Sequence, residues 1–198
     1  VQMKVVVLAA GQGYQLDGFN KLLIKDPRDG KSVIQKYQEA FPALPIEIVL
    51  GYKAINVMNI YPQYKYFYNS KWATTNNSYS LSLALDDSPV IVMSGDLLFD
   101  KEMGDVVLNA PDNSVFTQSR DSREMNSVNV KLGDGLLIDE LYQGPLKDQS
   151  DPESVGIFKI CDTRLLREWK RNCKLHSNLF AGLNLPIGLS GIEAFSLD

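Results

Sequence analysis

The stretch VVVLAAGQG at residues 5–13 decides the fold class of this chain. Its apolar residues predict a buried β-strand over residues 4–8, and the strand runs directly into a turn with glycine at two nearly adjacent positions. Glycine permits φ > 0 and a close approach to a ligand, so successive N–H groups of such a turn can surround an anion. The stretch therefore predicts an α/β protein that binds the phosphates of a nucleotide, with an ordinary tight turn as the alternative.

Two better-known phosphate-binding motifs are absent. The chain lacks the G-x-x-x-x-G-K-S/T sequence of a Walker-type P-loop. Leu16 stands where a dinucleotide-binding G-x-G-x-x-G turn needs its third glycine. The glycine turn therefore predicts a nucleotide site of another kind.

Composition narrows the classes of function. The 198 residues are 44% hydrophobic and 22% charged, which predicts one globular domain with a sizeable core. The net charge of -4 argues against a nucleic-acid binder, and no apolar run is long enough to span a membrane. Two cysteines and one histidine argue against a disulfide framework, a zinc site or a histidine-based triad. Without a signal-peptide pattern, the sequence predicts a cytoplasmic protein, and its first residue, valine, leaves open that it is a segment of a longer one.

Strand and helix patterns alternate in the first half of the chain, whereas strands dominate the second. This order predicts a mixed sheet with helices on both faces, in which the second half adds antiparallel strands. A Gly-Asp-Gly sequence at residues 133–135 predicts a hairpin, and Ser32 and Asp100 are expected to cap helices. The predicted strands cover residues 4–8, 46–50, 64–68, 90–93, 114–118, 128–132, 136–142 and 155–160, and the predicted helices cover residues 32–41, 77 or 78 to 85 and 163–172.

Ligands of open α/β sheets bind outside the carboxyl ends of the strands, and three polar clusters follow such ends here. Lys21 follows the glycine turn and can reach its phosphates, unless it is an ordinary surface lysine. Asp96 directly follows a predicted strand and can hold Mg²⁺ against a phosphate, unless it only forms a turn. The segment TTNNSYS at residues 74–80 offers amides and hydroxyls that can pair with a base, unless it only caps a helix. Trp72 and Tyr68 are expected in the core rather than stacked on a ligand.

These motifs occur in the order typical of one family. LAAGQG at residues 8–13 resembles its L-A-A-G-x-G motif, NKLL at 20–23 its P-K-x-L element, and IVLGY at 48–52 its V-x-G-Y strand. Asn69 with NNSYSL at 76–81 resembles a stretch of choline-phosphate cytidylyltransferase-like members, and SGD at 94–96 resembles the G-D metal motif. Residues 3–162 therefore resemble the nucleotidyltransferases that make NDP-sugars and CDP-alcohols.

The resemblance implies a fold and a reaction. The fold is a Rossmann-like three-layer α/β/α sandwich with a mixed, mostly parallel sheet, in one domain whose residues 1–110 bind the nucleotide and 111–198 the acceptor. The reaction is attack of a small phosphorylated or phosphonate acceptor on the α-phosphorus of a nucleoside triphosphate, with Mg²⁺ as cofactor and pyrophosphate as product. CTP is favoured because of the Asn-Asn-Ser-Tyr-Ser segment. A sugar-1-phosphate nucleotidyltransferase and a non-catalytic nucleotide-binding regulatory domain are the alternatives.

The resemblance also implies roles for individual residues. Lys21 neutralises charge at the α-phosphate, and Asp96 holds Mg²⁺. Asp198 or Glu193 is the second metal ligand, unless that ligand lies outside this chain. The remaining expected contacts are the nucleotide-binding residues Leu8, Ala9, Ala10, Gly11, Gln12, Gly13, Asn76, Asn77 and Ser80, and the acceptor-binding residues Arg120, Lys131 and Lys147.

The chain departs from the family pattern at two positions near the glycine turn. Gln15 stands where the family has an arginine, so Arg28 or Lys25 would have to supply charge to the terminal phosphates. Asn20 stands where the family has a proline before the lysine. These departures put the activity of the chain in doubt more than the resemblance itself.

Overall fold

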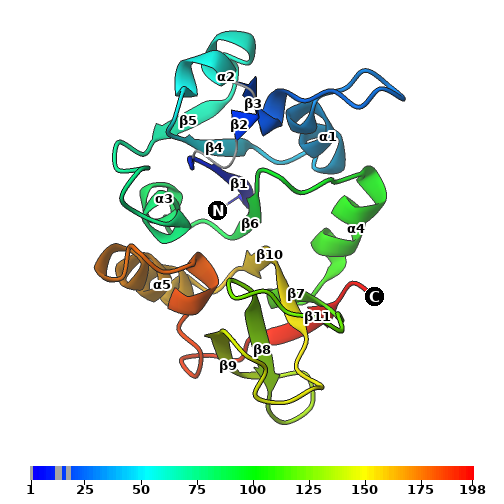
Figure 1. Ribbon diagram of the computed structural model, residues 1–198, viewed down its shortest axis with the longest axis vertical. Coiled ribbons are helices and arrows are strands. Elements are labelled where there is room, and N and C mark those ends of the chain that lie inside the picture. The colour runs from blue at the N-terminus through cyan, green and yellow to red at the C-terminus, as the bar shows by residue number, and fades with distance from the viewer. Residues whose placement is uncertain (1, 12–14, 17–18) are drawn as a thin grey trace.

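A mixed β-sheet organises the molecule (Figure 1). The computed structural model describes residues 2–11, 15, 16 and 19–198, with residues 15, 16 and 19 described for their backbone only. The described strands of this sheet are β1 (Lys4–Ala9), β4 (Ile46–Leu50), β5 (Lys65–Tyr68), β6 (Val90–Ser94), β7 (Asn113–Gln118), β8 (Val128–Leu132), β9 (Ile138–Gln143), β10 (Glu153–Ile160) and β11 (Glu193–Ser196). They follow the order β11-β7-β10-β6-β1-β4-β5, and β8 and β9 branch from β10.

The direction of the strands changes between the two halves of the chain. Strands β6, β1, β4 and β5 run parallel, and so do β11 and β7. Strand β10 runs antiparallel to β6, β7 and β8, and β8 and β9 form the hairpin that the sequence predicts. Four of the six neighbouring pairs along the main path are parallel, which confirms a mixed, mostly parallel sheet.

The central strand β1 is buried along its whole length. Because side chains of a strand alternate between the two faces of a sheet, Val5 and Val7 join one apolar cluster while Val6 and Leu8 join another. A strand covered on both faces is typically apolar along most of its length, and in β1 the buried exception, Lys4, forms an ion pair with Glu47. This explains why VVVLA could be recognised as a central strand from sequence alone.

Helices cover both faces of the sheet, which confirms the three-layer sandwich. Helices α1 (Val33–Ala40), α2 (Ala54–Ile60) and α4 (Lys101–Asn109) bury apolar side chains in the cluster with Val5 and Val7. Helices α3 (Asn77–Ala84) and α5 (Thr163–Leu175), with the 3₁₀ helix η3 (Ala181–Asn184), cover the opposite face. Figure 1 shows α1 and α4 on one side and α3 and α5 on the other. None of the helices in the described residues is long and apolar enough to cross a bilayer.

Side-chain caps begin most of these helices. Ser32 and Gln35 form a capping box at α1, and Asp100 accepts a hydrogen bond from the N–H of Met103 at α4, as the sequence predicts. Helix α3 is capped by Asn76, whereas the sequence predicts Asn77 or Ser78 as the cap. Helix α2 was not predicted, because its N-cap residue Lys53 has φ 51° and makes no side-chain cap.

The segment after α5 contains two further elements that the sequence does not reveal. The 3₁₀ helix η3 packs beside α3 and α5, and β11 joins the sheet next to β7 through the pair Glu193 and Ser114. Both elements are short, and β11 is held by pairing with a strand far away in sequence. Local periodicity therefore could not identify them.

The two cysteine thiols are expected to resist alkylation in the native protein. Burial raises the pKa of Cys173 to about 12, and burial with the nearby Asp112 carboxylate raises the pKa of Cys161. Only the thiolate is nucleophilic, so iodoacetamide near pH 8 should label both cysteines after unfolding but neither before it. Mass spectrometry of native and guanidinium-treated samples measures this. Rapid native labelling of Cys173 would contradict its place under α3.

Candidate active site

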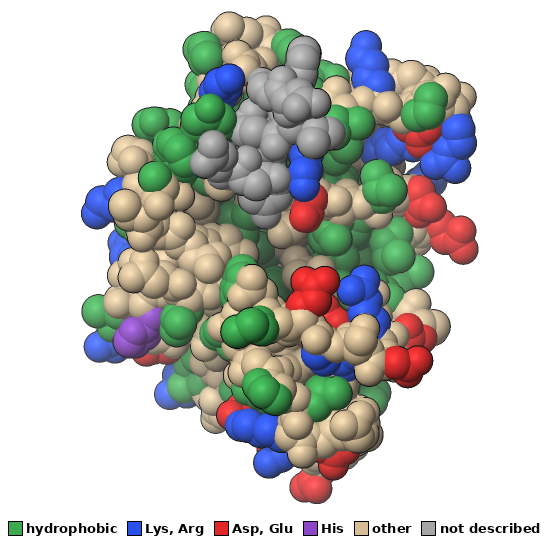
Figure 2. Space-filling model, in the orientation of Figure 1, with side chains coloured by type: hydrophobic (Ala, Val, Ile, Leu, Met, Phe, Trp, Pro, Cys, Tyr) green, Lys and Arg blue, Asp and Glu red, His purple; other side chains and the backbone are tan. Residues whose placement is uncertain are grey.

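A cavity of about 600 Å³ lies at the carboxyl ends of β1 and β6. This is the edge of an α/β sheet where ligands bind. In Figure 2 a hollow opens between the upper and lower halves of the molecule, with acidic side chains beside it. The lining residues from the first half of the chain are Leu8, Ala10, Gly11, Trp72, Thr75, Asn76, Asn77, Ser80, Val92, Ser94, Asp96 and Leu97. The second half contributes Asn126, Ser127, Val128, Glu153, Ser154, Val155, Gly156, Phe158, Phe180, Ala181 and Gly182.

The register of β1 and β6 brings Gly11 and Asp96 to one cavity. Leu8 lies opposite Ser94 in the parallel pair, and the N–H of Gly95 donates to the carbonyl of Leu8 at 3.0 Å. The chain then leaves both strands on the same side of the sheet, so Gly11 and the exposed Asp96 both line the cavity.

The start of α3 forms a polar wall whose side chains are partly engaged. Asn76 Oδ1 accepts from the N–H of Asn77 at 2.7 Å, and Ser80 Oγ accepts from Asn69 Nδ2 at 2.9 Å. Asn77 Oδ1 accepts from the N–H of Ala181 at 2.8 Å, which ties α3 to η3. Among the described residues, the Asn76 amide NH₂ and the Ser80 hydroxyl hydrogen have no acceptor, so both can donate to a ligand in the cavity.

An aromatic pair lies beside this polar wall. Trp72 lines the cavity, and its ring centroid lies 4.9 Å from that of Tyr52. The expectation that Tyr68 belongs to the core is wrong, because Tyr68 is 61% exposed at the end of the edge strand β5. Trp72 packs against the apolar cluster under α3 as well as facing the cavity.

Several predicted site residues do not line this cavity. Ala9 points into the apolar cluster on the opposite face of the sheet. Lys21 is the first residue of the 3₁₀ helix η2 (Lys21–Leu23). This helix lies beside the site, as shown by Leu22 Cδ2, which would be 3.1 Å from a Cβ added to Gly95. Gln12 and Gly13 lie outside the described residues.

The predicted cations of the second half are also elsewhere. Arg120 is exposed beyond the end of β7. Lys131 and Lys147 line a separate cavity of about 330 Å³, and Lys147 Nζ lies 2.8 Å from Glu140 Oε1. Lys131 follows the buried Val130 in β8 and points away from the sheet core, because neighbouring side chains alternate along a strand.

The two carboxylates suggested as a second metal ligand are also away from the cavity lining. Asp198 is 2.8 Å from the N–H of Ser119, and hydrogen bonds from Ser119 hold the pKa of the Asp198 carboxyl below its ordinary value. Glu193 lies in β11, at the edge of the sheet beside β7. The cavity instead has a carboxylate that the sequence did not suggest, Glu153.

Comparison with known proteins identifies the fold. No protein-family model and no curated protein matches the chain. The solved structure of CTP:phosphocholine cytidylyltransferase from Streptococcus pneumoniae matches with a TM-score of 0.77 and 18% identity, over 100% of this chain and 91% of that one. The inositol-1-phosphate CTP transferase from T. maritima matches with a TM-score of 0.71 and 14% identity, over 98% and 85%. The chain has the nucleotidyltransferase fold.

At this level of identity the likeness establishes the fold rather than the reaction. A mannose-6-phosphate isomerase from Helicobacter pylori matches as well, with a TM-score of 0.70 and 15% identity, over 100% of this chain and 98% of that one. The function of this nucleotidyltransferase fold therefore has to be argued from the residues of its cavity.

The direction of β10 explains why Glu153 could not be found by following strand ends. Because β10 is antiparallel to β6, its first residue lies beside the carboxyl ends of the parallel strands. Phe180, Ala181 and Gly182 reach the same cavity through the Asn77–Ala181 hydrogen bond, which joins residues 104 positions apart. The local signal for this part of the site was a carboxylate two residues before the predicted strand 155–160.

Replacing Gly51 by alanine is expected to destabilise the wall of the cavity. An added Cβ would lie 2.4 Å from the carbonyl oxygen of Ala10 and 2.6 Å from Trp72 Cβ, so the backbone of the glycine turn or Trp72 has to move. Overpacking of this kind costs roughly 1–3 kcal/mol, and urea denaturation measures it. Gly191→Ala is the control, because its added Cβ would meet only an ordinary contact at 3.5 Å. Equal effects of the two changes would contradict the close approach at Gly51.

Proposed function

We propose that the chain transfers a nucleotidyl group, with cytidylyl favoured, from a nucleoside triphosphate to a small phosphorylated or phosphonate acceptor, releasing pyrophosphate. The observation that carries the proposal is the shared cavity of Gly11 and Asp96. A glycine turn and a carboxylate at neighbouring strand ends supply the two things that a triphosphate needs, backbone donors and a ligand for a divalent cation.

The nucleotide would bind against the first half of the chain. Backbone N–H groups of the turn at residues 11–13 would hold the triphosphate, and the N-terminal end of α3 adds a favourable field for its negative charge. The free donors of Asn76 and Ser80 would bind the base or ribose.

Mg²⁺ fits the carboxylates of this cavity as a partner of the triphosphate. The described residues contain no group of three or more His, Cys, Asp or Glu side chains that could hold a metal, so phosphate oxygens would have to complete its coordination. Mg²⁺ is commonly bound in this way, through one or two carboxylates and substrate oxygens. Asp96 would be the ligand, and the bound ion would neutralise charge on the phosphates.

The reaction needs positioning and charge stabilisation rather than a covalent intermediate. An oxygen of the acceptor's phosphate or phosphonate attacks the α-phosphorus, the bond from that phosphorus to the bridging oxygen breaks, and pyrophosphate leaves with the electron pair. Holding both reactants in line supplies much of the rate enhancement. Lys21, one residue from the Leu22 that packs beside Gly95, would stabilise the negative charge that develops on the α-phosphate.

The favoured nucleotide rests on the polar start of α3 and on the names of similar structures. Both the S. pneumoniae and the T. maritima proteins are named as CTP-dependent transferases. Their identities of 18% and 14% do not fix the base that this chain binds, so CTP is the part of the proposal that most needs a direct test.

A panel of nucleotides tests the proposal. Thermal unfolding is measured with CTP, UTP, GTP and dTTP in the presence of Mg²⁺, because a ligand that binds only the folded state raises its stability. Pyrophosphate release is then measured with 2-aminoethyl phosphate, ethyl phosphate and glucose 1-phosphate as acceptors. Stabilisation by CTP and turnover with an alcohol phosphate are expected. Stabilisation by UTP or dTTP with turnover of glucose 1-phosphate would favour NDP-sugar synthesis, and nucleotide binding without turnover would favour a regulatory domain.

A further inference from the structure

Glu153 is a mostly buried carboxylate to which none of the described residues donates a hydrogen bond. It is the first residue of β10, it lines the cavity, and its side chain is 13% exposed. Its Oε2 atom is buried on the side of Arg123, out of reach of a ligand in the cavity, and no hydrogen bond among the described residues ends on either oxygen, so Oε1 is the atom that can accept one from a ligand. Burying a carboxylate without a hydrogen-bond donor costs free energy, so we expect Glu153 to accept a hydrogen bond from a bound ligand.

The neighbouring Arg123 does not fill that role. Its Nε atom lies 3.9 Å from Glu153 Oε2, which is an ion-pair distance but too long for a hydrogen bond. The same Nε donates to Asn129 Oδ1 at 2.9 Å, and the Arg123 guanidinium also donates to the carbonyls of Asp151 and Arg120. The N–H groups of Arg123 are therefore used in hydrogen bonds to Asn129 and to nearby backbone carbonyls. Glu153 remains able to accept hydrogen bonds from a ligand.

The cavity offers no other cation to Glu153. Among its described lining residues there are two carboxylates, Asp96 and Glu153, and neither a lysine nor an arginine. The aromatic residue Phe180 lines the same cavity. A carboxylate and an aromatic ring both attract an ammonium group, the first through charge-assisted hydrogen bonds and the second through its π face.

We propose that Glu153 selects an acceptor that carries an N–H-bearing ammonium group at the end opposite its phosphate or phosphonate. This inference rests on the proposed function, which places a phosphate at the glycine turn and Asp96. The acceptor would then lie with its reacting oxygen toward the nucleotide and its ammonium toward Glu153. Because the missing interaction is a hydrogen bond, a primary ammonium suits this site better than a trimethylammonium, which has no N–H to donate.

Matched acceptors test the proposal on the unaltered protein. Pyrophosphate release with CTP and Mg²⁺ is measured for 2-aminoethyl phosphate, for propyl phosphate, which replaces NH₃⁺ by CH₃, and for phosphocholine, whose nitrogen is trimethylated. We expect kcat/KM to be at least ~10-fold higher for 2-aminoethyl phosphate than for either of the others, as a hydrogen bond to a charged group would produce. Turnover with equal kcat/KM for 2-aminoethyl phosphate and propyl phosphate would overturn the inference while leaving the proposed function intact. Absence of turnover with every acceptor and nucleotide would overturn both.

A variant then assigns the preference to Glu153. Glu153→Gln keeps the shape of the side chain and should reduce the ratio of the two kcat/KM values toward 1, mainly through KM for 2-aminoethyl phosphate. A purely structural role would lower both values alike and leave the ratio unchanged, which would contradict the proposal. Glu140→Gln is the control, because Glu140 pairs with Lys147 outside this cavity and the ratio should stay as in the unaltered protein.

The Mg²⁺ requirement separates the proposal from its main rival. If Glu153 instead held the cation, Glu153→Gln would raise the Mg²⁺ concentration for half-maximal turnover and leave the acceptor ratio unchanged, which would overturn the assignment. Circular dichroism of Glu153→Gln shows whether the variant is folded. If it is not, the acceptor ratio of the unaltered protein still decides whether an ammonium is preferred, and Glu153→Asp, which keeps the charge, decides whether Glu153 provides it.

Discussion

Replacing Asp96 by asparagine is expected to lower kcat/KM for nucleotidyl transfer at least ~10²-fold, the loss typical of removing one preorganised charged group from an active site. The change keeps the size of the side chain and removes its charge. Asp96 is exposed and lines the cavity with Gly11, so its carboxylate is free to bind the divalent cation that accompanies a triphosphate. Steady-state pyrophosphate release over a range of Mg²⁺ concentrations measures the effect.

Asp100→Asn is the matched control for Asp96→Asn. Asp100 follows the same strand but caps α4 by accepting from the N–H of Met103 at 2.8 Å. Asparagine caps helices about as well as aspartate, so turnover and stability should both be nearly unchanged. If Asp96→Asn turned over normally, or if the two variants lost activity equally, Asp96 would not be the cation ligand.

The parts of the fold that sequence predicts are those fixed by neighbouring residues. Residues 5–9 of β1 are all apolar because both faces of the strand are covered, and the Ser32 and Asp100 caps act within three residues of themselves. Gly11 and Asp96 line one cavity because two parallel strands end at the same edge of the sheet. The strand pattern and the caps operate over a few residues, and the common edge follows once parallel pairing of the strands is assumed.

The parts that sequence does not predict depend on distant segments. Glu153 reaches the cavity because β10 reverses direction relative to β6, and Ala181 reaches it because Asn77 binds its N–H. Lys131 and Lys147 were suggested as acceptor-binding cations within the family resemblance, but Lys131 in β8 and Lys147 after β9 line another cavity. Charge sign predicts which ligands a residue can bind, whereas topology decides whether it meets them.

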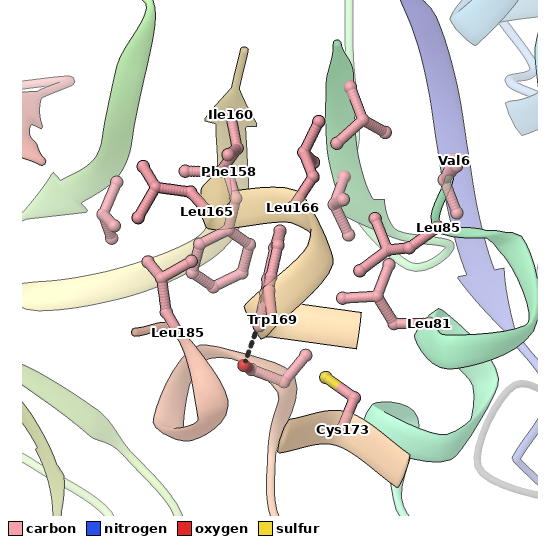
Figure 3. Packing of buried hydrophobic residues seen from close by; sticks show 14 of the residues in the cluster. Val6, Leu81, Leu85, Phe158, Ile160, Leu165, Leu166, Trp169, Cys173 and Leu185 are labelled. Atoms are coloured by element: carbon pink, nitrogen blue, oxygen red, sulfur yellow. Dashed lines mark hydrogen bonds between the residues drawn. The ribbon is translucent and has the colours of Figure 1, made fainter. Parts of the chain in front are cut away.

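The largest expected effect on stability comes from Trp169→Ala, which should lower the free energy of unfolding by about 3–5 kcal/mol. Trp169 is fully buried between α5 and the sheet, against Phe158 and beneath α3 (Figure 3). Its Nε1 donates to the carbonyl of Ala181 at 2.8 Å, so removing the ring leaves both a cavity and a buried acceptor without its donor. Urea denaturation followed by circular dichroism measures the loss without relying on tryptophan fluorescence.

Trp169→Phe separates these two contributions. Phenylalanine keeps most of the apolar contact but has no N–H, so we expect a smaller loss of roughly 1–3 kcal/mol from the unpaired carbonyl together with the smaller ring. Because Ala181 and Gly182 line the cavity, a shift of η3 in Trp169→Phe should also raise KM for the substrates. Cys173→Ala is the control, because it should lower the stability of the same core without removing a hydrogen bond to η3. Unchanged KM in Trp169→Phe would mean that other hydrogen bonds hold η3 in place, such as those from the Ala181 N–H to Asn77, from Asn184 to Ser78 and from Asn172 to the Asn184 carbonyl. The substitution thus tests whether the apolar core under α5 positions the part of the cavity wall that residues 180–182 form.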